Sequence, residues 1–216
     1  MKKEIILTPE ELYFMGVLLQ AKYIDYAYVA AMGDIQQRRE IYESESREGL
    51  ARKGVLIEDF SGNLEVDAEA KELLEPVFFG TLESSVDVVM QGGEERKALP
   101  GRRFHFHEGR ITTTAMGEDG ICLEAVDAGW IQAWLRALLP EGAPADGRAD
   151  VSIEDINRDK VSRIIAVKST LVGERAAVEI YVEAEGRIFC EKTAGQPQAL
   201  TREQFCLEAW RGIKGE

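Results

Sequence analysis

Alternation of apolar and polar positions is clearest in the middle of the chain. Between residues 86 and 126, apolar-rich runs are separated by short segments rich in Gly and charged residues. Two of these segments, Glu108-Gly109 and Glu118-Asp119-Gly120, have the composition of hairpin turns. The pattern therefore predicts antiparallel strands. Asp127 then caps a predicted amphipathic helix that ends at Pro140.

The last third of the chain repeats this order of strands followed by a helix. Its strand-like runs are 163–171, 177–183 and 187–192. The helix that follows them begins with a capping box, Thr201-x-x-Gln204. We therefore predict two similar β-β-β-α units, residues 86–140 and 151–216. The Gly-, Ala- and Pro-rich segment 141–150 is predicted to be the linker between them.

Helical signals dominate the N-terminal region. The segment Thr8–Glu11 is a capping box that begins a helix, and a second, very polar helix follows it. Residues 55–66 have the pattern of a small hairpin. Asp67 is predicted to cap another helix, which ends before Pro76. The order helix, helix, hairpin, helix predicts a winged-helix-like region over residues 1–85.

These patterns together predict an α+β fold in which one or two antiparallel sheets are covered by helices. The chain has 216 residues, of which 45% are hydrophobic and 30% are charged. This is the composition of an ordinary globular protein and is long enough to bury a core without disulfides or metals. We expect the repeated units and the N-terminal region to form one compact domain.

Charge and cysteine content restrict the partners and the compartment. The formal net charge is −13, which opposes nucleic-acid binding and adhesion to anionic lipid. No segment approaches the ~18 apolar residues that span a bilayer, so no membrane insertion is predicted. The odd set Cys122, Cys190 and Cys206 contains no C-x-x-C pair, which indicates a reducing compartment. We predict a cytoplasmic protein whose three thiols are buried.

A winged-helix-like region suggests a transcriptional regulator as an alternative function. Residues 58–63, at the tip of the predicted hairpin, include two carboxylates and neither Lys nor Arg. The DNA phosphates would lie at this tip, and carboxylates repel them. The charge of the tip therefore disfavours DNA binding.

Only two histidines are present, His105 and His107, and they alternate with Phe104 and Phe106 along a predicted strand. Their spacing is compatible with one metal ion held together with Glu108, so a metal-dependent enzyme is a second alternative. The simpler interpretation is a histidine pair that faces solvent or a partner. No phosphate-binding loop or paired acid and base is evident. We therefore predict no catalytic residue, no cofactor and no enzymatic activity.

One basic segment stands out in this acidic chain. Residues 92–103 form a predicted loop with four cationic side chains, and Arg110 follows at the next turn. A positive edge beside the predicted strand of Phe104 and Phe106 would attract an acidic, partly apolar protein. The alternative is that these cations pair with carboxylates of the chain itself. The predicted partner-binding residues are Arg96, Lys97, Arg102, Arg103, Phe104 and Phe106.

The order of features resembles the EspG-type chaperones of type VII (ESX) secretion systems and their counterparts in Gram-positive bacteria (Firmicutes). The matching segments are 7–12, 50–56 with the Gly62 turn, Val66-Asp67, 73–76, 124–126, 186–189 and Ala199-Leu200 with the closing helix. They extend over most of the chain.

This resemblance implies a cytosolic, non-enzymatic chaperone or adaptor that binds a helical secretion substrate. It also implies a pseudo-twofold α+β fold. The nearest equivalent of the substrate-binding hairpin of that family would be the segment Gly92 to Arg103 with its flanking strand. No oligomeric state follows from the sequence or from the resemblance.

Overall fold

The computed structural model describes residues 4–22, 24–32, 39–92, 95–139, 160–171, 174–191 and 198–216. In chain order its elements are β1 (Glu4–Leu7), α1 (Pro9–Leu18), α2 (Tyr26–Ala30), α3 (Arg39–Arg52), β2 (Leu56–Glu58), β3 (Leu64–Val66), α4 (Ala68–Phe79), β4 (Leu82–Gly92), β5 (Glu95–His107), β6 (Arg110–Gly117), β7 (Gly120–Val126), α5 (Ala128–Ala137), β8 (Val161–Leu171), β9 (Ala177–Ala184), β10 (Arg187–Glu191), β11 (Gln198–Leu200) and α6 (Arg202–Ile213). The fold is α+β, as the sequence predicts.

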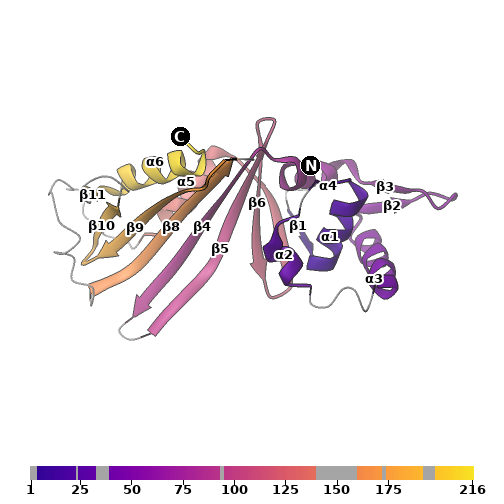
Figure 1. Ribbon diagram of the computed structural model, residues 1–216, viewed down its shortest axis with the longest axis horizontal. Helices are drawn as coiled ribbons and strands as arrows, with labels where there is room; N and C mark the ends of the chain where they lie inside the picture. Colours follow the sequence, from indigo (N-terminus) through magenta and orange to yellow (C-terminus); the bar gives the residue numbers. More distant parts are fainter. Residues whose placement is uncertain are drawn as a thin grey trace. The chain divides into compact units, whose positions relative to one another are not determined.

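The main strands are hydrogen-bonded in the order β1-β7-β6-β5-β4-β8-β9-β10-β11. Figure 1 shows strands β4, β8, β9, β10 and β11 of unit 2 side by side in this order. Antiparallel registers connect β1 to β7, β4 to β8, and β8 through β11 in succession. Strands β2 and β3 form a separate antiparallel pair. The predicted antiparallel architecture and the small N-terminal hairpin are therefore confirmed. Strands β1 and β11 were not predicted, because each has only three or four residues. In addition, β1 pairs with β7, which lies far along the chain, so no local hairpin signal marks it.

Contacts divide the chain into two units. Unit 1 contains Met1–Gly80 and His105–Ala125, and unit 2 contains Thr81–Phe104 and Val126–Glu216. Residues of the first predicted repeat, 86–140, occur in both units. The predicted linker 141–150 lies outside the described residues. The repeat and the winged-helix likeness of residues 1–85 remain predictions.

Helix α1 of unit 1 begins as the sequence predicts. The Glu11 amide donates to Thr8 Oγ1 at 3.2 Å, and the Thr8 amide donates to Glu11 Oε2 at 2.8 Å. These two bonds form the reciprocal capping box. Glu11 also accepts from Lys53 Nζ at 2.5 Å, so its buried carboxylate has a cationic partner from the end of α3. The box therefore connects α1 to α3 as well as starting the helix.

Helix α4 corrects one prediction. It begins after the Asp67 cap, but it runs to Phe79 with Pro76 inside instead of ending before the proline. Val77 and Phe78, beyond the proline, are buried in the core of unit 1 with residues of α1 and β7. Burial of two large apolar side chains outweighs the one helical hydrogen bond that proline cannot donate.

In unit 2, helices α5 and α6 lie against strands of the sheet (Figure 1). Asp127 caps α5, and the Thr201–Gln204 capping box begins α6, both as predicted. The rings of Tyr181 on β9 and Phe205 on α6 meet edge to face with centroids 5.0 Å apart, and both side chains are buried. This aromatic pair fixes α6 on the sheet. Among the described residues, no helix has the length and apolar character needed to cross a bilayer.

The three thiols differ in accessibility. Cys190 and Cys206 are buried, whereas Cys122 is only partly buried, which corrects the expectation that all three are enclosed. Burial raises the pKa of the Cys206 thiol, so little reactive thiolate forms at neutral pH. We expect iodoacetamide to modify Cys122 on the order of tenfold faster than the two buried thiols in the folded protein. Peptide mapping by mass spectrometry measures these rates, and equal rates for Cys122 and Cys206 would contradict the packing of α6.

Candidate partner-binding surface

The basic segment lies on a strand and not in a loop. Strand β4 extends to Gly92 and β5 begins at Glu95, so the predicted loop of residues 92–103 is largely strand. Gly101 and Pro100 suggested a loop from local composition alone. Pairing of β5 with its neighbours β4 and β6 overrides that local signal. The four cations are therefore carried by a regular, hydrogen-bonded element.

The cations at the start of β5 differ from those further along the strand. Arg96 and Lys97 are exposed, and neither forms an ion pair with a carboxylate in the described part of the chain. We call these two residues the β5 cation pair. Because their charges are solvated, they are available to attract an acidic partner from solution.

Arg102 and Arg103 are half-buried and have partners within unit 2. Arg103 forms an ion pair of 2.8 Å with Glu83 of β4. The Arg102 guanidinium lies 5.0 Å from the centroid of the Trp130 ring of α5, in cation–π geometry. In unit 1, Arg110 likewise pairs with Glu75 at 2.8 Å. The alternative that these cations pair within the chain therefore holds for Arg103 and Arg110, but not for the β5 cation pair among the described residues.

Phe104 is a core residue of unit 2. Its side chain is fully buried, and its ring meets Trp134 edge to face at a centroid distance of 5.6 Å. Trp134 in turn stacks on Trp130 at 6.4 Å, and Arg102 covers the outer end of this row. We call the row, Arg102, Trp130, Trp134 and Phe104, the aromatic ladder. It holds α5 against β5 and leaves Phe104 no surface for direct contact with a partner, whereas Phe106 is half-buried.

The two histidines have different environments. His105 is buried, and its Nε2 atom lies 3.1 Å from Thr114 Oγ1 on β6. Thr114 also forms a short hydrogen bond with the Tyr28 hydroxyl of α2. His107 is half-buried beside the Phe79 ring. The expectation that both histidines face solvent or a partner is wrong for His105, because its side chain is buried and lies within hydrogen-bonding distance of Thr114.

In the part of the chain that the structure describes, no group of three or more His, Cys, Asp or Glu side chains is arranged to hold a metal ion. His105 instead belongs to a buried polar cluster, made of Tyr28, His105 and Thr114, that the sequence analysis missed. The signal available in the sequence was the run Thr112-Thr113-Thr114, since three successive buried threonines on one strand require polar partners on at least one face.

Neither a family model nor a curated protein matches this sequence. Among solved structures, the chain is similar to the Mycobacterium tuberculosis type VII secretion system chaperone EspG5, determined in complex with the PE25–PPE41 dimer. The similarity covers 98% of this chain and 94% of that chain, with a TM-score of 0.57 and 12% sequence identity. The chain has the EspG5 fold.

The EspG5 fold accounts for nearly the whole length of both chains, so the likeness is not that of one shared motif. The resemblance to EspG-type chaperones inferred from the sequence is thus confirmed for the fold. At 12% identity the likeness concerns the path of the backbone, and it assigns no role to individual side chains.

Proposed function

We propose that this chain is a cytosolic, non-enzymatic chaperone or adaptor that keeps a helical substrate of a type VII-like secretion system soluble. The observation that carries the proposal is the EspG5 fold over 98% of the chain, since EspG5 is a secretion chaperone solved with a bound PE25–PPE41 dimer. A substrate of comparable kind, held by its apolar surface, is the partner that this fold supports best.

The proposed contact surface is centred on the β5 cation pair. Arg96 and Lys97 are exposed cations in a chain of net charge −13, so they form a local contrast that favours an acidic partner. Ala98 is also exposed and Leu99 is half-buried, which places apolar atoms beside the charges. The aromatic ladder supports this surface from within, because it holds the later part of β5 in place. Arg102, Arg103, Phe104 and Phe106 thus contribute to the surface mainly by positioning β5.

Charge reversal tests the surface. The double variant Arg96→Glu/Lys97→Glu is expected to weaken substrate binding by about tenfold or more, because attraction becomes repulsion at the contact. The measurement is co-expression with small helical proteins of a type VII-like secretion system, followed by titration of the purified pair at low and high salt. The wild-type complex should weaken with salt, and the variant should lose most of that dependence.

A matched control carries the same change of charge at another exposed site of unit 2, Lys168→Glu/Arg175→Glu. This control should bind as wild type does. An equal loss of substrate affinity in both double variants would indicate a non-specific charge effect. It would exclude the β5 cation pair as the contact surface. Failure of the wild-type protein to solubilise any of these helical secretion proteins would overturn the chaperone function itself.

A further inference from the structure

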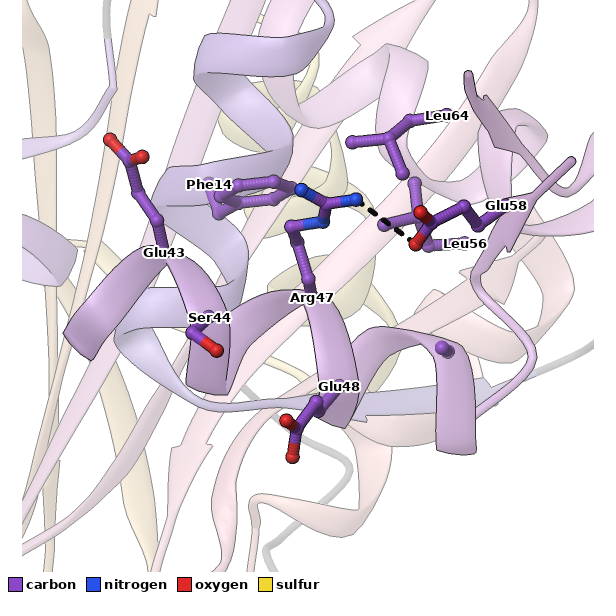
Figure 2. Close-up of a pocket in the computed structure, with 9 residues that line it drawn as sticks. Phe14, Glu43, Ser44, Arg47, Glu48, Leu56, Glu58 and Leu64 are labelled. Atoms are coloured by element: carbon purple, nitrogen blue, oxygen red, sulfur yellow. Dashed lines mark ion pairs between the residues drawn. The ribbon is translucent and has the colours of Figure 1, made fainter. Parts of the chain in front are cut away.

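A second surface with opposite charge lies in unit 1. Helix α1, helix α3 and the β2–β3 hairpin enclose a groove of about 670 Å³. Figure 2 shows Arg47 extending from α3 past the Phe14 ring towards Glu58 of β2. The described residues that line it are Phe14, Glu43, Ser44, Arg47, Glu48, Ala51, Leu56, Glu58 and Leu64. We call this the unit 1 groove.

The lining of the groove combines an apolar base with an acidic rim. Phe14, Leu56 and Leu64 supply the apolar side chains, and all three belong to or pack against the core of unit 1. Among the described residues, the rim carries three carboxylates and one cation, Arg47. An apolar side chain from a ligand would therefore find a rigid base, and neighbouring cations of that ligand would find carboxylates.

Arg47 and Glu58 form an ion pair of 3.0 Å between α3 and β2. Their side chains are 41% and 50% exposed, so the pair is well solvated and contributes little to stability. A cation supplied by a ligand can replace Arg47 at Glu58 with almost no loss of folding energy. Arg47 thus occupies the groove as an internal cation that a cation of the ligand can displace from Glu58.

We propose that the unit 1 groove binds a basic, partly apolar peptide segment of a protein partner, with a ligand Lys or Arg exchanging for Arg47 at Glu58. The acidic rim disfavours nucleic acid and anionic lipid, whose phosphates it would repel. This inference does not rest on the proposed function, because the groove and the β5 cation pair share no residue and differ in charge. It adds a binding site for a cationic partner.

Two synthetic peptides serve as probes: an amphipathic peptide of Lys and Leu, and the same peptide with Glu in place of Lys. Titration calorimetry with the full chain should show salt-sensitive binding of the Lys and Leu peptide only. A third peptide with Ser in place of Leu should bind on the order of tenfold more weakly, because it cannot use the apolar base. If the Ser peptide bound as tightly as the Lys and Leu peptide, binding would depend on surface charge alone. That result would overturn the proposal that the groove is the binding site.

Variants of the groove should change the affinity for the Lys and Leu peptide in opposite directions. Arg47→Ala removes the internal cation and should tighten binding of the Lys and Leu peptide by about threefold to tenfold. Glu43→Lys/Glu48→Lys should weaken it by about tenfold or more. The control Glu65→Lys/Glu72→Lys makes the same change of charge at exposed positions of unit 1 outside the groove lining. It should have a smaller effect than the groove variant.

Weaker binding of the Lys and Leu peptide to Arg47→Ala would mean that Arg47 supports binding instead of competing with the ligand for Glu58, which contradicts the proposal. Equal weakening by the groove variant and the control variant would show that the peptide responds only to the net charge of the chain. Thermal unfolding of each variant checks that folding is intact, and Arg47→Ala should unfold close to wild type because its ion pair is solvated.

Discussion

Phe104→Ala is expected to lower the free energy of unfolding by about 3–5 kcal/mol, the cost of removing a large side chain from a closed core. Phe104 is fully buried, and its ring is the inner end of the aromatic ladder. The substitution leaves a cavity between β5 and α5 and removes the edge-to-face contact with Trp134. For a chain of this length the expected loss in melting temperature is roughly 6–20 °C.

Phe106→Ala is the matched comparison, because it removes the same atoms two residues further along β5. Phe106 is half-buried, so its substitution should cost clearly less than that of Phe104. At temperatures where both variants are folded, Phe104→Ala should still capture the substrate. Normal stability with lost capture in Phe104→Ala would identify Phe104 as a direct contact and would refute its place in the core.

Local signals in the sequence were sufficient for the helix starts. The caps at Thr8, Asp67, Asp127 and Thr201 were each predicted from one to four residues, and each is present. A cap is decided by hydrogen bonds within a single turn, so no distant residue needs to be known. Most long strands were found for a related reason, since hairpin turns and alternating patterns are also local.

Local signals failed where distant packing decides the structure. Pro100 and Gly101 suggested a loop, yet both lie within β5. A Cβ atom at Gly101 would lie 2.5 Å from Asp87 Oδ1 and 3.2 Å from the Val86 carbonyl oxygen. The glycine is therefore required by close approach of β4, not by a turn. Composition alone does not distinguish these two uses of glycine.

The candidate surface was predicted in part. The sequence shows where the four cations lie along the chain. It does not show that Arg96 and Lys97 are exposed whereas Arg102 and Arg103 have partners within unit 2. Arg103 pairs with Glu83, twenty residues earlier in the chain, and Arg102 covers a tryptophan on the following helix. Such partners follow only from the sheet order. Alternation placed Phe104 and His105 on opposite faces of one strand, but it does not reveal that both side chains are buried.

The buried threonines of β6 provide the second large expected effect. Thr114→Val should lower the free energy of unfolding by about 1–3 kcal/mol, because it removes the hydroxyl that bonds both His105 and Tyr28 in the core. Its neighbour Thr113 is fully buried as well, but its hydroxyl has no hydrogen-bond partner among the described residues. Thr113→Val should therefore be neutral or stabilising by up to about 1 kcal/mol.

The two substitutions are identical in chemistry, equal in burial and adjacent on one strand, so their difference isolates the hydrogen bonds of the polar cluster. Urea denaturation of both variants measures that difference through the transition midpoint at unchanged slope. Similar losses in the two variants would contradict the cluster, because they would show that packing of the hydroxyl, and not its bonding, determines the cost. A loss confined to Thr114→Val would establish the Thr114 hydroxyl as the group that connects β6 to His105 of β5 and Tyr28 of α2.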